Sequence, residues 1–375
     1  MHIVFFVNHF LPDVGGVQWS TLRTAEALVR RGHRVTVITE TAAGEMDDDA
    51  FPFDIIRFRV PVRRPFTRFG YWRWMWRQRR MLATADVLHF HDYTPFFHWF
   101  LPLRALIHGP RYAVTFHGFE GSPIRLRHRF FRAVTARCCH VRFAVGDYLR
   151  HQYRHPIDAV YIGAPVRMMA PVTGGQDRKR SGLSFFYAGR LAEDTGILPF
   201  LECLHDCTGR TKTNAVVRIA GEGPLREAAE ALVTEHLDID FLGVRDDLTG
   251  LYKEADLVIA TGFLGIFEAW STGLPVLVPA FDELKRLYVA SIPEAEDSLT
   301  IMTTVAQCRE LILILLRGEG STILSGRAHH AIGFVSQLRW DDIAVMYEAW
   351  YDPAQRIRPA SQLAVIEARG ETHAD

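Results

Sequence analysis

The sequence predicts two consecutive α/β domains, each a parallel sheet with helices on both faces. The chain of 375 residues is longer than one compact core usually holds. Short apolar runs alternate with helix-like segments along most of it, which is the pattern of doubly wound sheets. A polar stretch rich in Gly and charged residues at 167–183 interrupts the pattern, and we interpret it as a linker.

The first series covers residues 1–166 and begins with a strand, a glycine-containing loop, a helix and a second strand. The continuous apolar run at 2–8 suits a parallel strand buried on both faces. Residues 20–33 have helical spacing, with Gly32 as the expected C-terminal cap. The second strand is 35–39, and further strands are expected at 55–60, 87–90, 112–116, 141–146 and 161–165.

The second series, 184–339, has the same architecture without repeating the sequence. Strands are expected at 183–189, 215–223, 239–243, 257–261 and 275–279, with helices between them. Residues 340–351 form an amphipathic helix whose Asp-rich first turn suits the helix dipole. The tail, 359–375, is expected to be weakly ordered.

The formal net charge is zero, but the two halves differ. Residues 1–166 contain 23 Arg, no Lys and 13 acidic residues, a balance of +10 that the remainder cancels. A basic domain favours an anionic partner. Five scattered Cys indicate a reducing compartment, and the start of the sequence lacks the features of a signal peptide. With no apolar run long enough to span a bilayer, we expect a cytoplasmic protein.

In the first domain, two loop positions are candidates for ligand binding. Gly15 and Gly16 precede the first helix, where a bare backbone and a helix N-terminus suit an anion such as diphosphate; a plain turn is the alternative. His117 ends the strand 112–116, at the edge where open α/β sheets bind ligands, unless it is a structural histidine. His89 and His91 share a strand face but lack further metal ligands, so no metal is predicted.

In the second domain, Gly189 and Arg190 end the first strand, and Arg190 could hold a diphosphate unless it forms a surface ion pair with Glu193 or Asp194. The segment Gly221–Gly223 opens a helix after the next strand; its structural role is clear and a ligand role is open. In the first domain, Gly15 and Gly16 do not form the dinucleotide fingerprint, which disfavours a nicotinamide cofactor.

A third segment of the second domain enters a helix directly after the strand 257–261. Exposed amides at that helix start suit a phosphate, and a Glu inside so apolar a stretch needs a partner, for which we favour ribose hydroxyls. The candidate donor-binding residues of the segment are Gly262, Phe263, Leu264, Gly265 and Glu268.

Residues 57–80 form a basic and aromatic stretch with nine Arg and no acidic residue. Such a surface suits an anionic membrane or a lipid-linked acceptor, and the stretch 125–132 adds to it. Single-stranded nucleic acid is a weaker alternative, and so is pairing of these Arg with the acidic residues at 47–49. The candidate membrane or acceptor residues are Arg63, Arg64, Trp72, Trp74 and Trp76.

Together these features resemble the retaining GT-B glycosyltransferases of the family 4 (glycosyl transferases group 1) type, over about residues 1–350. The resemblance includes Gly15-Gly16, His117-Gly118, Gly189-Arg190-Leu191, the segments 221–224 and 241–243, and Glu268-Ala269 with 273–276. It implies two Rossmann-like domains facing a central cleft, with residues of about 340–358 crossing back to complete the first.

The resemblance implies transfer of a hexose from a nucleoside-diphosphate sugar to a hydroxyl acceptor, a lipid-linked or polysaccharide precursor, with retention. No metal or other cofactor is expected, and the place of action is the cytoplasm or the cytoplasmic face of a membrane. His117 and Arg190 become the catalytic residues, contacting the transferred sugar and the diphosphate respectively. Gly16 meets the diphosphate, Glu268 the ribose and backbone near Val244 the base.

Two positions depart from the family pattern. Thr195 stands where a Lys is usual, five residues after Arg190, and Ala260 stands where a second Glu is usual, eight residues before Glu268. These departures motivate an alternative, a non-catalytic GT-B protein that acts as a binding or assembly partner. A sugar-nucleotide epimerase or hydrolase of similar fold is a further alternative.

Overall fold

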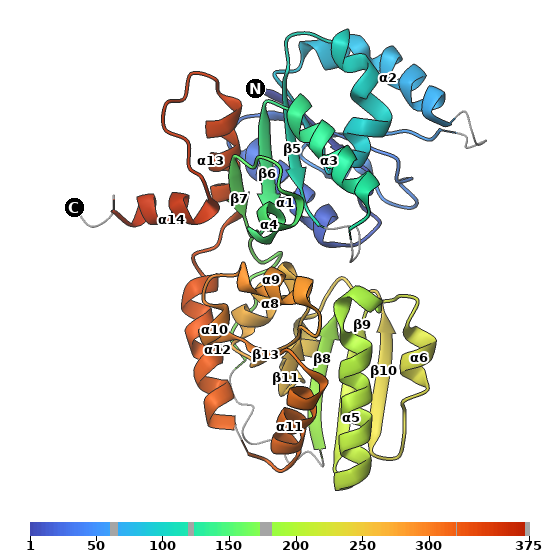
Figure 1. Cartoon of the computed structure of the whole chain (residues 1–375), viewed down its shortest axis with the longest axis vertical. Helices are drawn as coiled ribbons and strands as arrows, with labels where there is room; N and C mark the ends of the chain where they lie inside the picture. The colour runs from blue at the N-terminus through green and yellow to red at the C-terminus, as the bar shows by residue number, and fades with distance from the viewer. Residues whose placement is uncertain (61–66, 119–123, 173–181, 320, 372–375) are drawn as a thin grey trace. The chain divides into compact units, whose positions relative to one another are not determined.

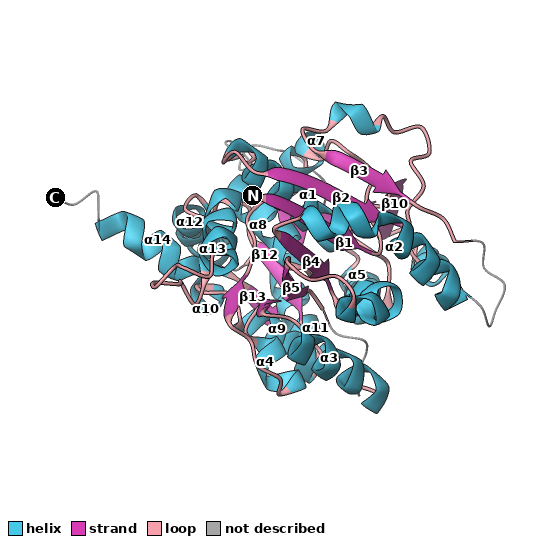
Figure 2. Cartoon of the chain, turned by 90° about the horizontal axis from the view of Figure 1, so that it is seen from above, coloured by secondary structure: helices cyan, strands magenta, loops and turns pink. Residues whose placement is uncertain are grey.

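The computed structural model describes residues 1–60, 67–118, 124–172, 182–319 and 321–371. The chain divides into two compact units (Figure 1). Unit 1 is Met1–Gly163 together with Arg339–Asp375, and unit 2 is Ala164–Leu338. Each contains a parallel sheet with helices packed beside it (Figure 2), as the alternation of apolar runs and helical segments predicts.

The sheet of unit 1 has the strand order β3-β2-β1-β4-β5-β6-β7, and all its pairs are parallel. Its central strand β1 is apolar because both of its faces are covered, and Ile3 to Phe6 have no exposed surface. The strands are β1 (His2–Val7), β2 (Arg34–Thr39), β3 (Asp54–Arg57), β4 (Val87–His91), β5 (Arg111–Phe116), β6 (Val141–Val145) and β7 (Ala159–Tyr161).

The main helices of unit 1 include two that come from the end of the chain. They are α1 (Gly16–Arg30), α2 (Thr67–Thr84), α3 (Leu126–Cys138), α4 (Tyr148–Tyr153), α13 (Trp340–Tyr351) and α14 (Gln362–Glu371). Shorter helical segments are η1 (Asp48–Ala50), η2 (Pro95–Phe100) and η3 (Leu101–Ala105).

Helix α13 packs against α1. Glu348 joins the two elements, with its carboxylate 2.6 Å from Arg31 Nε and 2.7 Å from His33 Nε2. The sequence predicts a weakly ordered tail at 359–375. The structure differs there, because α14 follows α13 and covers Gln362–Glu371. The buried side chain of Gln362 accepts hydrogen bonds from the Ile162 and Gly163 amides and donates to the Gly163 carbonyl, which fixes this segment.

The sheet of unit 2 has the order β10-β9-β8-β11-β12-β13, again with parallel pairs. The sequence did not indicate β13, because Thr300–Met302 is short and only two of its residues are apolar. The strands are β8 (Gly182–Ala188), β9 (Asn214–Ala220), β10 (Leu237–Gly243), β11 (Leu257–Ile259), β12 (Val276–Pro279) and β13 (Thr300–Met302).

The helices of unit 2 cover a core built from the inner faces of the sheet, α5 and α11. They are η5 (Glu193–Thr195), α5 (Ile197–Thr211), α6 (Arg226–Glu230), α7 (Thr249–Lys253), α8 (Phe263–Thr272), α9 (Glu283–Ala290), α10 (Ala295–Ser298), α11 (Val305–Leu316) and α12 (Ser321–Val335). Within the described ranges, no helix is long and apolar enough to cross a membrane.

Each strand order contains one point where the chain switches direction across the sheet. In unit 1 this point lies between β1 and β4, and in unit 2 it lies between β8 and β11. Open parallel sheets bind ligands beyond the carboxyl ends of the strands at such a point. The loops that follow these strands are therefore where each unit can best form a site.

Candidate functional site

The loop after β1 leads into α1 through Gly15 and Gly16. Gly15 is the N-cap in an extended conformation, and a Cβ added to Gly16 would meet no atom within 4 Å. Among the described residues no side chain caps this helix start, and its first turn carries no acidic residue. The amides of the first turn are therefore suited to an anion.

His117 follows β5 and is held by groups from the end of β4. Its Nε2 lies 2.7 Å from His91 Nδ1, and its backbone amide donates to Asp92 Oδ1 at 3.1 Å. Burial lowers the pKa of His117 to about 3, and the charges of His89 and Arg132 act in the same direction. The ring is thus neutral at physiological pH, and it can offer a hydrogen bond but no charge.

A buried hydrogen-bond network lies beneath His117. His89 contacts the Tyr351 hydroxyl through Nδ1, and its Nε2 lies 2.8 Å from Thr115 Oγ1. Thr115 Oγ1 lies 2.8 Å from the Tyr347 hydroxyl. Burial lowers the pKa of His89 and His91 well below the ordinary value, and neighbouring histidines add to this. The His-x-His pair is therefore part of a neutral network that joins β4 to α13.

In unit 2, Arg190 leaves the end of β8 with an exposed side chain. Its guanidinium pairs with Asp194 at 2.8 Å, which is one of the two ion pairs considered from the sequence. The Tyr187 hydroxyl donates to the Arg190 carbonyl at 2.7 Å and fixes the backbone there. An exposed pair of this kind contributes little to stability, so a phosphate can compete for the guanidinium at small cost.

The glycines of this edge have a packing reason of their own. A Cβ on Gly221 would lie 1.9 Å from the Gly189 carbonyl oxygen, and one on Gly223 would lie 2.3 Å from the Leu191 carbonyl oxygen. A Cβ on Gly189 itself would lie 2.8 Å from the Tyr187 hydroxyl. Glycine here permits the loops after β8 and β9 to touch through their backbones, which explains the structural role expected of 221–223.

The start of α8 lies beside these loops, because β11 is paired with β8. Gly262 is its N-cap, and the amide of the buried Phe263 donates to the Tyr288 hydroxyl at 2.8 Å. Leu264 and Gly265 are half-buried in the first turn. A Cβ on Gly265 would lie 3.8 Å from the Ala188 carbonyl oxygen at the end of β8.

Glu268 and Val244 complete the candidate donor-binding residues. Glu268 is half-buried on α8. Burial raises the pKa of the Tyr252 phenol well above its ordinary value, and the charge of Glu268 adds to this effect. Val244 follows β10 and is 58% exposed.

The candidate membrane or acceptor residues differ in their surroundings. Trp72 donates its indole N–H to the His98 carbonyl at 3.1 Å, and Trp74 stacks on Phe58 with ring centroids 4.3 Å apart. Trp76 is 46% exposed. Arg63 and Arg64 lie outside the described residues.

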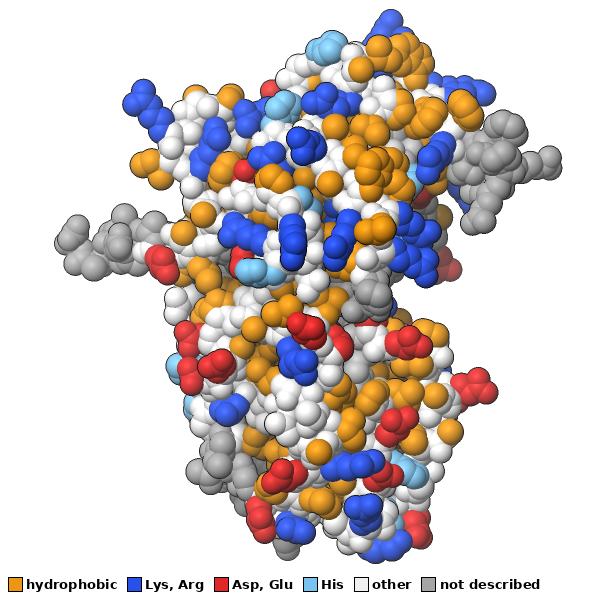
Figure 3. Space-filling model, viewed as in Figure 1, with side chains coloured by type: hydrophobic (Ala, Val, Ile, Leu, Met, Phe, Trp, Pro, Cys, Tyr) orange, Lys and Arg blue, Asp and Glu red, His pale blue; other side chains and the backbone are white. Residues whose placement is uncertain are grey.

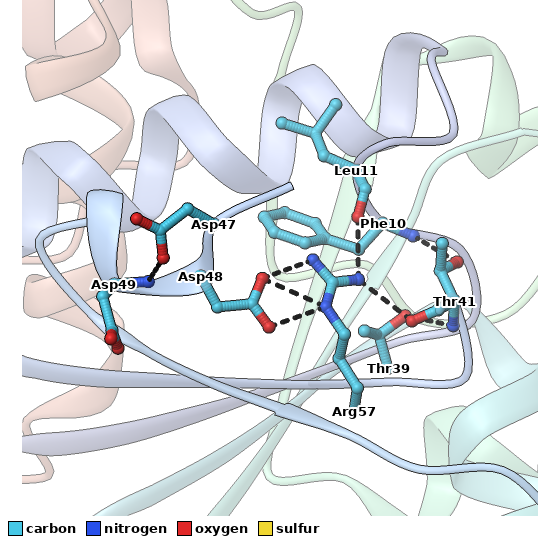
Figure 4. A network of polar contacts seen from close by, with 8 residues as sticks. All are labelled: Phe10, Leu11, Thr39, Thr41, Asp47, Asp48, Asp49 and Arg57. Carbon is cyan, nitrogen blue, oxygen red and sulfur yellow. Dashed lines mark hydrogen bonds and ion pairs between the residues drawn. The ribbon is translucent and has the colours of Figure 1, made fainter. Parts of the chain in front are cut away.

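One arginine of the basic stretch 57–80 does pair with the acidic segment 47–49 (Figure 4). The Arg57 guanidinium lies 2.7 Å from Asp48 and donates to the carbonyls of Leu11 and Thr41 at 2.8 and 2.9 Å. This residue is therefore tied into the loop after β1, whereas Arg73, Arg77 and Arg80 on α2 are exposed.

Three residues near the strand ends were not candidates in the sequence. Asp92 has a left-handed backbone, with φ of 67°, and accepts the His117 amide. Arg132 on α3 is fully buried, with its guanidinium 4.0 Å from the Tyr153 ring centroid and in contact with the Gly118 carbonyl. Lys285 on α9 is 6% exposed. Their partners come from distant segments, so local sequence carries no signal for them.

Within the described parts of the chain, one group of three side chains could offer metal ligands. Glu294, Asp297 and His330 have ligand atoms within 4.8 Å of one another. All three are exposed, and His330 already pairs with Glu294 at 2.6 Å. They lie on α12 and at α10, away from the strand ends described above.

Two family models match consecutive parts of the chain. Residues 14–163 match Glycosyltransferase Family 4, and residues 182–295 match Glycosyl transferases group 1. The chain belongs to this family of glycosyltransferases. No curated protein matches it in sequence.

Solved structures share the fold of the whole chain at low sequence identity. HepE from Anabaena, in complex with UDP and glucose, has a TM-score of 0.71 at 13% identity and covers 100% of this chain and 99% of its own. WaaG, a glycosyltransferase involved in lipopolysaccharide biosynthesis, has a TM-score of 0.68 at 16% identity, covering 94% and 100%. The chain therefore has the two-domain α/β architecture of the GT-B glycosyltransferases.

The same fold occurs in proteins with other activities. A protein described as a UDP-N-acetylglucosamine 2-epimerase from Listeria monocytogenes has a TM-score of 0.61 at 13% identity, covering 95% of this chain and 98% of its own. Fold likeness at this identity does not select a reaction, so the choice among activities depends on the residues at the strand ends.

Proposed function

We propose that this glycosyltransferase moves a hexose from a nucleoside-diphosphate sugar to a hydroxyl of a lipid-linked or polysaccharide precursor, with retention of configuration and without a bound metal. Unit 2 binds the donor and unit 1 the acceptor. The observation that carries the proposal is the edge of unit 2, where an exposed guanidinium, close-packed glycine loops and a helix start with glycine at its N-cap follow adjacent parallel strands.

In the proposed reaction the bond between the anomeric carbon and the diphosphate breaks, and the nucleoside diphosphate departs with the electron pair. The acceptor hydroxyl oxygen forms the new bond to the anomeric carbon on the same face, and its proton passes to the departing diphosphate. Arg190 neutralises the charge that develops on it, because a guanidinium offers a planar pair of N–H donors. Glu268 holds the ribose hydroxyls, and backbone at Val244 meets the base. The neutral His117 positions a hydroxyl of the transferred sugar by hydrogen bonding.

Donor binding and turnover test this proposal. Thermal unfolding against UDP, GDP, ADP and their sugar conjugates finds the base, since a ligand at 100 times its Kd stabilises by about 2.7 kcal/mol. With that donor, Arg190→Ala and Glu268→Ala should lower turnover by about 100-fold without lowering the melting temperature. Arg309→Ala is the control, because Arg309 forms a similar exposed pair with Asp206 at 2.7 Å.

Three outcomes would contradict the assignment. Full activity of either variant would remove its residue from the site. A folded protein that binds none of the nucleotides would favour the non-catalytic alternative that Thr195 and Ala260 motivate. Release of free sugar or of an epimer without any acceptor would favour an epimerase or hydrolase.

We also propose that unit 1 meets an anionic membrane surface through α2 and α3. On α2, Phe69 is 61% exposed and Trp76 is 46% exposed. On α3, Leu126 is 82% and Phe130 is 60% exposed. The same helices carry exposed Arg, and Figure 3 shows basic side chains gathered over this unit. Apolar side chains among cations suit the boundary of an anionic bilayer.

Co-sedimentation with vesicles tests the membrane proposal. Phosphatidylglycerol vesicles should bind the protein more than phosphatidylcholine vesicles, and added salt should weaken the binding. Trp76→Ser with Phe130→Ser should reduce binding, whereas Val233→Ser, an exposed apolar residue of unit 2, should not. Substitution of Arg63 and Arg64 should weaken it as well. Equal binding to neutral and anionic vesicles would contradict the proposal.

A further inference from the structure

Position 195 lacks the positive charge that is usual in the family. Thr195 is 5% exposed, and its Oγ1 donates to the Ala192 carbonyl at 2.6 Å. Its side chain is thus used inside the turn η5 and is not directed to a ligand. If the chain binds a diphosphate, a second cation beside Arg190 would have to come from another element.

A buried lysine reaches the same edge from α9. Lys285 is 6% exposed, and its Nζ donates to the Thr261 carbonyl at 2.9 Å. Thr261 directly precedes Gly262, the N-cap of α8. The ammonium therefore lies at the start of the helix whose first turn is the candidate phosphate-binding segment.

Packing brings the loop before Lys285 against the residues that follow Thr195. A Cβ on Gly196 would lie 3.0 Å from the Pro279 carbonyl oxygen and 3.7 Å from the Phe281 ring. Lys285 is also close enough to Asp194 and Arg190 for their charges to act on it: burial lowers its pKa, Asp194 raises it and Arg190 lowers it. Lys285 and position 195 are thus neighbours in the fold.

The location of Lys285 is unfavourable for a merely structural residue. It lies in the first turn of α9, where the helix dipole disfavours a cation. In the described part of the chain the Thr261 bond is the single hydrogen bond of the ammonium, with the Tyr288 ring centroid 5.1 Å from Nζ. The backbone amide of Lys285 donates to the N-cap Asp282 at 2.8 Å, and the charge of Asp282 favours the ammonium. Removing an ammonium from water costs free energy. An anion that accepts hydrogen bonds from its two further N–H donors offsets this cost.

We propose that Lys285 binds the diphosphate of the donor and supplies the cation that the family pattern places at position 195. This inference rests on the proposed function, because it concerns the same donor site. It also explains how a chain with Thr195 can keep donor binding. The cation is supplied by α9 instead of η5, and a positive charge beside Arg190 is retained.

Titration calorimetry with a nucleoside diphosphate and with its parent nucleoside tests the proposal. UDP with uridine, GDP with guanosine and ADP with adenosine are the probes. Lys285→Gln keeps an N–H donor for the Thr261 carbonyl without the charge, and Lys285→Met keeps the apolar stem. Either should weaken diphosphate binding by about 10- to 100-fold and leave nucleoside binding within about 2-fold.

Two further variants sharpen the result. Lys212→Gln removes an exposed lysine that precedes β9, at the opposite ends of the strands, and should change neither affinity. In Thr195→Lys combined with Lys285→Gln, the charge returns to the family position, and diphosphate binding should recover. Circular dichroism establishes that each variant is folded.

The outcomes separate this inference from the proposed function. Unchanged diphosphate affinity in folded Lys285→Gln and Lys285→Met would overturn the role of Lys285 and leave the proposed function intact. Equal weakening of diphosphate and nucleoside would also overturn it, because a structural lysine would act on both. Wild-type protein that binds no nucleoside diphosphate would overturn the proposed function and this inference with it.

Discussion

The two units form their candidate sites at the same edge of the same kind of sheet, but with different electrostatics. In unit 1, which contains the basic residues 1–163, the strand ends carry neutral histidines. In unit 2, which is acidic overall, the strand ends carry Arg190 and Lys285 (Figure 3 shows the contrasting surfaces). The net charge of a domain therefore does not predict the charge at its site, because burial and close partners decide the latter.

The largest expected effect is a difference between the two units in how their stability depends on pH. His89, His91 and His117 have pKa values lowered by burial, whereas an unfolded histidine titrates near the ordinary value of 6.5. Between these values the unfolded chain binds more protons, so stability rises with pH. The full contribution of the histidines is present above pH 6.5 and is lost as the pH falls toward about 3 for His117.

Unit 1 should thus lose about 1.4 kcal/mol per pH unit for each histidine that must take up a proton. Among the described residues, no histidine of unit 2 is buried. Hydrogen exchange at pH 7 and pH 5, corrected for intrinsic rates, should show that β4 and β5 lose protection before β8 and β11. If both sheets lose protection together, the network does not control the acid response.

The next effect concerns the backbone contacts of unit 2. Gly223→Ala places a Cβ 2.3 Å from the Leu191 carbonyl oxygen. The two loops cannot easily move apart, because the Leu191 amide donates a hydrogen bond to the Glu222 carbonyl at 3.0 Å. We expect a loss of about 2–4 kcal/mol in the free energy of unfolding of unit 2. Denaturant unfolding measures it, with Gly250→Ala as control, since a Cβ there meets no atom within 4 Å. Equal losses in both variants would contradict the close-approach argument.

The sequence predicts the sheets and the loops at their edges because these depend on local patterns. The strands β1, β2, β8 and β9 follow from apolar runs, and α13 begins and ends where its amphipathic pattern does. Contacts between segments that are far apart in the sequence do not follow from local patterns. Neither the contact between His91 and His117 nor the approach of Lys285 to Thr261 has a local signal, because each joins segments separated by more than twenty residues. The positions of the candidate residues at the strand ends were thus predictable from the sequence, whereas their surroundings were not.

A smaller effect tests how the end of the chain is held in unit 1. Burial raises the pKa of Glu348, but hydrogen bonds from Arg31 and His33 outweigh it and place the pKa below the ordinary 4.5. A lowered carboxyl pKa contributes stability above the unfolded value, and the contribution is lost as the pH falls through the folded value. Glu348→Gln should cost about 1 kcal/mol at pH 7 and nearly nothing at pH 3.

Equilibrium unfolding in urea at the two pH values measures this effect. Asp341→Asn is the matched control, because Asp341 joins the same two helices through a more exposed pair with Arg30 at 3.2 Å and should cost less. A cost for Glu348→Gln that stays the same at pH 3 would show that packing, and not the charge, is responsible.

Gly16→Ala should have the smallest effect on stability. It also distinguishes the role of Gly16 in unit 1 from that of Gly223 in unit 2. A Cβ on Gly16 has open space around it, and alanine is the better helix former, so Gly16→Ala should change the stability of unit 1 by about 0.5 kcal/mol or less. If Gly16 meets the donor diphosphate as proposed, the same methyl group stands where the ligand must approach, and turnover should fall by about 10-fold. Gly209→Ala, on α5 with equally open space, should raise stability by up to about 1 kcal/mol and leave turnover unchanged. Loss of turnover without loss of stability would mean that unit 1 keeps its glycine for a ligand, whereas unit 2 keeps Gly223 for its own backbone. Unchanged turnover would remove Gly16 from the donor site.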